Sequence, residues 1–199
     1  HDSFSTKEPE TLEWIDQNLR ENDIFFDIGA NIGIYSLYGA SKKIKNCKFY
    51  SFEPEYSNLD QLKFNIVKNN LEKYIYPYSL AFSDSIKPSF LHIQNLTPGA
   101  ALHTEAPTFN DKNIQKSVFK EGIITYSLDL FCQDLNICPN LIKIDVDGNE
   151  LKVLKGSQKT LTNVNLRTII IELDNINIKK ECENLLTENS FYLISSFKK

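Results

Sequence analysis

Short apolar runs alternate with segments of helical period along this chain, and this alternation constrains the fold more than any other feature. Several of the runs lack polar alternation, as parallel strands buried on both faces do. The runs have strand length, are rich in Ile, Phe and Tyr, and cover residues 24–28, 48–52, 75–80, 141–146, 168–173 and 191–195. The pattern predicts an α/β fold: a mostly parallel sheet of six strands with helices on both faces.

Composition excludes several functional classes. The net charge is −4 and the basic residues are scattered, so we expect no nucleic-acid partner. No apolar run approaches the roughly 20 residues that cross a bilayer, so we expect no membrane span. The four cysteines form no CxxC pair, which predicts reduced thiols and a cytoplasmic protein. The chain contains no methionine, and we therefore expect it to be part of a longer protein.

The strongest local motif is FFDIGANIG at residues 25–33. An apolar strand leads into Asp27, Gly29 and Gly33 then enclose small and polar residues, and a helical pattern begins near Ile34. Small residues let the backbone turn tightly and approach a ligand, while the N-terminus of the next helix offers unpaired N–H groups. The motif predicts a ligand-binding loop, although a purely structural turn would have a similar sequence.

Glu53 supports the ligand-binding interpretation. It ends the next strand 20 residues after Gly33, where an acidic residue accepts hydrogen bonds from the ribose of a nucleotide cofactor. Asp27 would repel a pyrophosphate but can accept from an α-ammonium group, and the loop lacks the full GxGxxG spacing. The residues therefore favour S-adenosylmethionine over NAD. A nicotinamide-dependent oxidoreductase and a non-catalytic cofactor-binding domain are the alternatives.

Five segments in the same order resemble one enzyme family. They are DIGANIG (27–33), FEPE (52–55), AFSD (81–84), SLD (127–129), and IKIDVDGNE (142–150) with IIIEL (169–173). Together they resemble the FkbM-type family of S-adenosylmethionine-dependent methyltransferases, over roughly residues 10–195. The resemblance implies a Rossmann-like class I methyltransferase fold. It also implies O-methylation of a hydroxyl on a sugar, glycan or secondary metabolite.

The resemblance also implies roles for individual residues. The cofactor-binding set would be Asp27, Gly29, Ala30, Asn31, Gly33, Glu53, Phe82, Ser83 and Asp84. Within it, the glycine loop would surround the methionyl and ribose parts, and Glu53 would bind the ribose diol. Phe82 and Asp84 would flank the adenine, although Asp84 could instead cap a loop.

The fourth strand and the long loop before it supply the catalytic candidates. Lys143 and Asp145 share one side of the strand, so they could form an ion pair that organises the loop. Alternatively, Asp145 faces the transferred methyl group and orients or deprotonates the acceptor hydroxyl. His103 is the candidate general base because a neutral imidazole can accept a proton near pH 7, but it could equally be a surface histidine.

Three oxygen-bearing residues at the same edge of the predicted sheet could hold a metal ion. Asp145, Asp174 and Asn175 resemble the cation site of catechol-type O-methyltransferases, and their oxygen atoms suit Mg²⁺. That site belongs to a different branch of the superfamily, so we expect no bound metal. The expected partner is a small-molecule or glycan hydroxyl acceptor.

We expect a single methyltransferase domain over residues 1–199. Its parts would be an N-terminal helix (8–22), a cofactor-binding half (23–84), an insertion (85–126) and a second half (127–199). The insertion, between the third and fourth strands, interrupts the alternation with two apolar pieces around a long polar loop. This predicts a β-hairpin whose loop acts as a lid.

Overall fold

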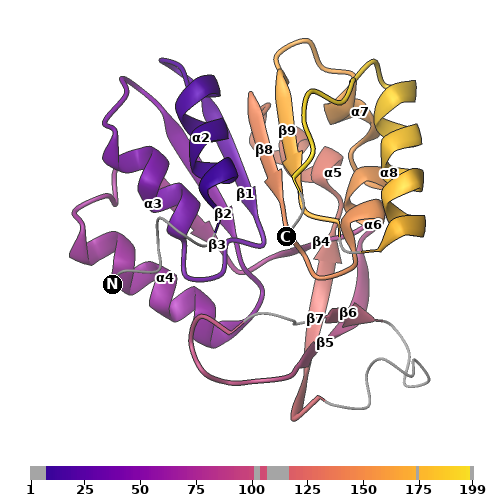
Figure 1. Ribbon diagram of the computed structural model, residues 1–199. Coiled ribbons are helices and arrows are strands. Elements are labelled where there is room, and N and C mark those ends of the chain that lie inside the picture. The colour runs from indigo at the N-terminus through magenta and orange to yellow at the C-terminus, as the bar shows by residue number, and fades with distance from the viewer. Residues whose placement is uncertain (1–7, 101–103, 107–116, 174, 198–199) are drawn as a thin grey trace.

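The main sheet is parallel throughout and has five strands. The computed structural model describes residues 8–100, 104–106, 117–173 and 175–197. The strands are β1 (Ile24–Ile28), β2 (Lys48–Phe52), β3 (Ile75–Tyr78), β8 (Leu141–Ile144) and β9 (Thr168–Ile171), and their spatial order is β3-β2-β1-β8-β9 (Figure 1). The bounds predicted for β1 and β2 are confirmed to the residue. The other three strands end earlier than predicted.

The predicted sixth strand at residues 191–195 is wrong. This segment has no regular structure, and Tyr192, Leu193 and Ile194 are all exposed. Aromatic and β-branched residues favour a strand only where a neighbouring strand and a packed face receive them. An apolar run without such neighbours therefore does not extend the sheet.

Helices cover both faces of the main sheet, as predicted. One face packs against α2 (Pro9–Asn18), α3 (Ile34–Ser41) and α4 (Tyr56–Lys68). The other packs against α5 (Leu128–Leu135), α6 (Glu150–Lys155), α7 (Gln158–Leu161) and α8 (Ile176–Glu188). Successive side chains of β1 alternate between the two cores: Phe25 belongs to the first and Phe26 to the second. The N-terminal helix is shorter than predicted.

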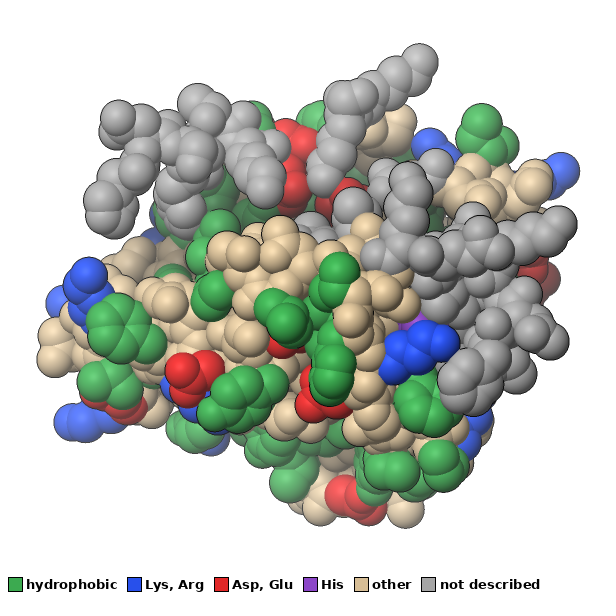
Figure 2. Space-filling model, turned by 90° about the horizontal axis from the view of Figure 1, so that it is seen from below, with side chains coloured by type: hydrophobic (Ala, Val, Ile, Leu, Met, Phe, Trp, Pro, Cys, Tyr) green, Lys and Arg blue, Asp and Glu red, His purple; other side chains and the backbone are tan. Residues whose placement is uncertain are grey.

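The insertion forms a second sheet below the carboxyl ends of the main strands (Figure 1). The insertion contributes β5 (Lys87–Ile93), β6 (Thr104–Ala106) and β7 (Phe119–Tyr126) to this sheet, and β4 (Ala81–Phe82), just before the insertion, completes it in the order β4-β7-β5-β6. β5 and β7 form the predicted antiparallel hairpin. The sequence did not indicate that β6 would pair with β5, or β4 with β7 in parallel. Seen from below, hydrophobic side chains are spread over this end of the molecule between polar groups (Figure 2).

Two sequence expectations concern the whole chain. All four cysteines are free thiols. Among the residues that the structure describes, none belongs to a helix with the length and apolar character that a bilayer crossing requires.

An aromatic cluster stabilises the core on the sheet face that is covered by α5, α6, α7 and α8. The Phe26 ring centroid lies 5.2 Å from that of Phe52 and 5.9 Å from that of Phe131. Phe52 and Phe131 lie 5.0 Å apart. These edge-to-face contacts link β1, β2 and α5.

We expect Phe26→Ala to lower the free energy of unfolding by about 3–5 kcal/mol, because it leaves a cavity in this cluster. The matched control is Phe64→Ala on α4, whose side chain is 58% exposed. That change should cost less than about 1 kcal/mol. Urea denaturation measures both, and equal losses would contradict the central place given to the cluster.

Candidate active site

A cavity of about 90 Å³ lies where the strand order of the main sheet reverses, between β1 and β8. Open α/β sheets bind ligands at this point, beyond the carboxyl ends of their strands. The lining comes from both halves of the main sheet and from the insertion: Ile28, Gly29, Asn31, Phe52, Glu53, Pro54, Asn58, Leu80, Ala81, Phe82, Leu91, Ala100, Glu105, Asp145, Val146, Asp147 and Asn149. We call it the switch-point cavity.

The glycines of the loop after β1 are required by the protein's own packing. A Cβ on Gly29 would lie 1.7 Å from the Asp145 carbonyl oxygen, and a Cβ on Gly33 would lie 2.2 Å from a Leu62 methyl. Both glycines, and Asn31 between them, have positive φ. The loop thus lies directly on the chain leaving β8, which brings Asn31 and Asp145 to one cavity.

Glu53 holds this loop from the end of β2. Its Oε2 accepts from the Asn31 backbone N–H at 2.8 Å, and its Oε1 accepts from the Glu55 N–H at 2.9 Å. Burial raises the pKa of the Glu53 carboxyl to about 7, although these two N–H groups oppose the rise. Each carboxylate oxygen keeps a further lone pair, so Glu53 can also accept from a ligand in the cavity.

Lys143 is buried beneath the cavity and pairs with two carboxylates. Its Nζ lies 3.4 Å from Asp27 and 3.5 Å from Asp145, and it donates to the Gly29 carbonyl oxygen at 3.2 Å. Burial lowers the pKa of this amine, but the charges of Asp27 and Asp145 outweigh burial and hold the pKa above its ordinary value. The ion pair between Lys143 and Asp145 that the sequence suggests is present. Asp145, with a side chain 32% exposed, also lines the cavity.

A tight turn of the insertion docks on the glycine loop. The Ala100 N–H donates to the Thr97 carbonyl oxygen at 3.0 Å, and Gly99 at the third position has φ of 87°. Asn58 receives the Gly99 N–H at 2.8 Å and donates to the Ala100 carbonyl oxygen at 3.2 Å. Asn31 donates to the same oxygen at 3.0 Å. The turn closes one side of the cavity.

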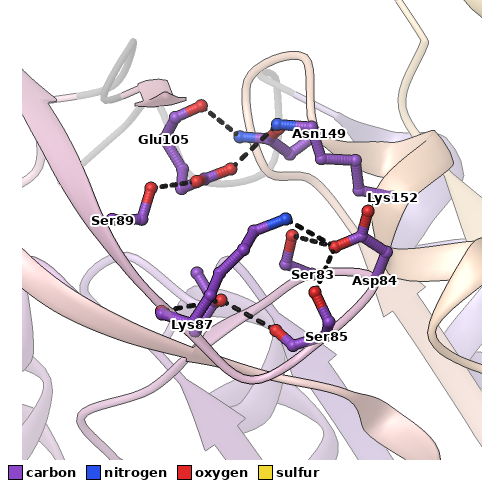
Figure 3. Close-up of polar contacts among 9 residues, drawn as sticks. Ser83, Asp84, Ser85, Lys87, Ser89, Glu105, Asn149 and Lys152 are labelled. Atoms are coloured by element: carbon purple, nitrogen blue, oxygen red, sulfur yellow. Dashed lines mark hydrogen bonds and ion pairs between the residues drawn. The ribbon is translucent and has the colours of Figure 1, made fainter. Parts of the chain in front are cut away.

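The insertion docks on the second half of the chain through Glu105 (Figure 3). The Glu105 side chain is buried, receives the Ser89 hydroxyl, and lies 3.0 Å from Lys152 Nζ. Asn149, immediately before α6, donates to the Glu105 carbonyl oxygen at 3.0 Å. The insertion therefore bridges the switch point from α4 to α6.

The structure brings only some of the predicted cofactor residues to the cavity. Lining residues among them are Gly29, Asn31, Glu53 and Phe82, and the catalytic candidate Asp145 joins them. Ala30 and Gly33 shape the loop behind. His103 lies outside the described residues.

The structure places Asp27, Ser83 and Asp84 away from the cavity lining. Asp27 is fully buried, and its second oxygen accepts from the backbone N–H and hydroxyl of Ser36. The Ser83 N–H donates to the Tyr126 carbonyl oxygen at 2.8 Å. Asp84 pairs with Lys87 at 2.7 Å, and this hydrogen-bonded amine lowers the pKa of Asp84 (Figure 3). Asp84 thus has the loop-organising contacts of its alternative interpretation.

Sequence reasoning missed Asn58 and Glu105. Asn58 lies three residues after the FEPE segment, which could have drawn attention to it. Glu105 has no such neighbour, since its position depends on the pairing of β6 with β5.

The residues suggested for a cation site are not assembled in the described part of the chain. Asn175 caps α8, accepting from the N–H groups of Asn177 and Ile178, and Asp174 lies outside the described residues. Within the described ranges, no three or more His, Cys, Asp or Glu side chains form a group suited to a metal ion.

Comparisons with known proteins identify the chain as a methyltransferase. Residues 27–193 match the family described as the methyltransferase FkbM domain. Hexuronic acid methyltransferase AglP of Haloferax volcanii is 28% identical over 188 residues, which cover 91% of this chain and 68% of that protein. Methyltransferase sdnD of Sordaria araneosa is 27% identical over 199 residues, covering 87% and 75%.

A solved structure supports the fold. The crystal structure of methyltransferase FkbM from Methylobacillus flagellatus KT has a TM-score of 0.52 at 17% identity, and the match covers 96% of this chain. It covers 48% of that chain, so the present chain spans about half its length. The family match contradicts the alternative of a nicotinamide-dependent oxidoreductase. The chain belongs to the FkbM family of methyltransferases and has the Rossmann-like class I methyltransferase fold.

Proposed function

We propose that this methyltransferase uses S-adenosylmethionine to methylate a hydroxyl group of a sugar, glycan or secondary metabolite. The observation that carries the proposal is Glu53, whose buried carboxylate lines the cavity at the switch point. A sugar acceptor is further supported by the relative named for hexuronic acid. We also propose a single cytoplasmic domain that acts without a metal ion on a small molecule or glycan rather than on nucleic acid.

The cavity has suitable chemistry for the cofactor. Glu53 offers lone pairs to a ribose diol, while Phe82 and Leu80 offer apolar surface to an adenine. Asn31 Oδ1 is buried and has no hydrogen-bond partner among the described residues. A buried acceptor without a partner is costly, so a ligand donor such as an ammonium or hydroxyl would satisfy it.

Asp145 is the residue that we assign to the acceptor. S-adenosylmethionine supplies a methyl group on a sulfonium, a good leaving group, so the protein chiefly has to align the acceptor and exclude water. Lys143 holds Asp145 by an ion pair at 3.5 Å, which fixes the carboxylate at the cavity wall. There it can accept a hydrogen bond from the acceptor hydroxyl and orient the oxygen for in-line attack. Asp27 acts indirectly, by holding Lys143.

The insertion acts as a lid in this proposal. Ligand cavities usually measure about 300–1,000 Å³, whereas the switch-point cavity measures about 90 Å³. The turn at residues 97–100 closes one side of the cavity, so its movement would make room for the cofactor. Three hydrogen bonds to Asn31 and Asn58 oppose that movement.

We expect S-adenosylhomocysteine to bind about tenfold more tightly at pH 8 than at pH 6. The pKa of Glu53 is about 7 in the free protein, and a ribose diol donates to the ionised carboxylate. Binding should therefore release protons near pH 6–7, and affinity should rise as pH increases through 7. Calorimetry in buffers of different ionisation enthalpy measures both effects. The Glu53→Gln variant should bind weakly and without this pH dependence; an unchanged profile would remove Glu53 from the cofactor site.

We expect Asn58→Ala to accelerate association of S-adenosylhomocysteine severalfold, because it removes two of the three tethers of the turn. Stopped-flow fluorescence provides the rate constants. The control is Asn69→Ala at the far end of the same helix, where the side-chain amide bonds only to the Asn65 carbonyl oxygen. Slower or unchanged association in Asn58→Ala would show that the turn does not gate entry.

Methyl transfer itself is tested by incubating the chain with S-adenosylmethionine and a panel of sugars, glycans and hydroxylated metabolites. We expect S-adenosylhomocysteine release with a hydroxyl acceptor, unaffected by a chelator. Asp145→Asn should lower kcat by at least about 100-fold while changing cofactor affinity less than threefold. Equal losses in kcat and affinity would instead assign Asp145 to cofactor binding, and cofactor binding without transfer to any acceptor would contradict the proposed function.

A further inference from the structure

The acceptor side of the switch-point cavity is lined with carboxylates. Four lining residues are acidic, namely Glu53, Glu105, Asp145 and Asp147, and among the described residues no lysine, arginine or histidine lines it. Glu53 lies on the side of the glycine loop. The other three come from the insertion and from the segment after β8, where the acceptor would enter next to Asp145.

Glu105 is a buried carboxylate with fixed partners on this side of the cavity, not a surface carboxylate. Its side chain is 5% exposed, its Oε2 lies 3.0 Å from Lys152 Nζ, and its Oε1 receives the Ser89 hydroxyl. Glu105 lines the cavity whereas Ser89 and Lys152 do not, and Figure 3 shows both of these side chains contacting the Glu105 carboxylate. A carboxylate has about four lone-pair sites, so Glu105 can still accept a hydrogen bond from an acceptor in the cavity.

A cavity side lined with carboxylates favours neutral acceptors over anionic ones. A neutral polyol can donate hydrogen bonds to a fixed carboxylate, whereas a ligand carboxylate or phosphate brought beside Glu105 meets a like charge at low dielectric. Lys152 offsets part of this repulsion, but its side chain is 36% exposed, so water screens its charge. Discrimination by a repulsive group is a general route to specificity.

We propose that Glu105 is a specificity-determining residue that selects an uncharged hydroxyl acceptor, such as a neutral sugar, and rejects the corresponding uronate, in contrast to the relative named for hexuronic acid. The inference rests on the proposed function and narrows its substrate class. Asp145 orients the reacting hydroxyl, and Glu105 repels an acceptor that carries a negative charge next to that hydroxyl.

The experiment compares matched acceptors that differ in one charge: glucose with glucuronate, and galactose with galacturonate, offered as their methyl glycosides. Release of S-adenosylhomocysteine gives kcat/KM for each. We expect the neutral member to be favoured at least about tenfold. Glu105→Gln should reduce this ratio at least threefold by raising kcat/KM for the uronate rather than by lowering kcat/KM for the neutral sugar. Lys152→Gln, which leaves Glu105 in place without its cation, should increase the ratio.

The control Glu183→Gln removes the carboxylate of the exposed Lys179–Glu183 ion pair on α8, outside the cavity, and should leave the ratio as in the wild type. The opposite signs for Glu105→Gln and Lys152→Gln separate a charge effect from simple loosening of the insertion, which would move both variants the same way. Equal use of uronates by the wild type, or an unchanged ratio in Glu105→Gln, overturns the inference while leaving the proposed function intact. Cofactor binding without transfer to either member of any pair overturns the inference, and failure of cofactor binding overturns the proposed function itself.

Discussion

The site depends on the ion pairs and the hydrogen bond of the buried Lys143 ammonium. It joins the end of β1 through Asp27, the segment after β8 through Asp145, and the glycine loop through the Gly29 carbonyl oxygen. A buried charge without partners is strongly destabilising, so these oxygens must stay close to the amine. The same constraint holds the loop against the Asp145 carbonyl, where only glycine fits at position 29. The Lys143 ammonium therefore fixes the positions of the residues that form the floor of the cavity.

The insertion completes the site from the other side. Its turn docks on Asn31 and Asn58 of the first half, and Glu105 docks on Asn149 and Lys152 of the second half. These contacts are polar, whereas the cores beneath the main sheet are aromatic and aliphatic. Asn58, Glu105 and Asn149 are buried, so the proposed lid movement would exchange their protein partners for water while the two cores stay packed.

The sequence predicts the parts of this fold that depend on local pattern. The buried runs of β1 and β2 are continuous apolar segments, and their bounds follow directly. Residues 191–195 have the same local character but form no strand, and Tyr192, Leu193 and Ile194 are exposed, since a strand there would need a neighbour that the pattern cannot supply. The glycine loop and Glu53 were found by spacing. Glu105 was not, because its contact with Lys152 spans 47 residues and arises only when β6 pairs with β5.

Two carboxylates that line the cavity each form an ion pair with a lysine: Asp145 with Lys143, and Glu105 with Lys152. The two pairs differ in burial and in the part of the fold that carries them. Lys143 is buried in the main sheet, so Asp145 is placed with the rigidity of the core. Lys152 is partly exposed on α6, and its partner Glu105 belongs to the insertion. The group assigned to the reacting hydroxyl thus stays with the sheet, while the group assigned to selection travels with the lid. A change of acceptor would then involve the insertion, which carries Glu105, and the segment after β8, which carries Asp145 and Asp147, while the cofactor loop lies outside both.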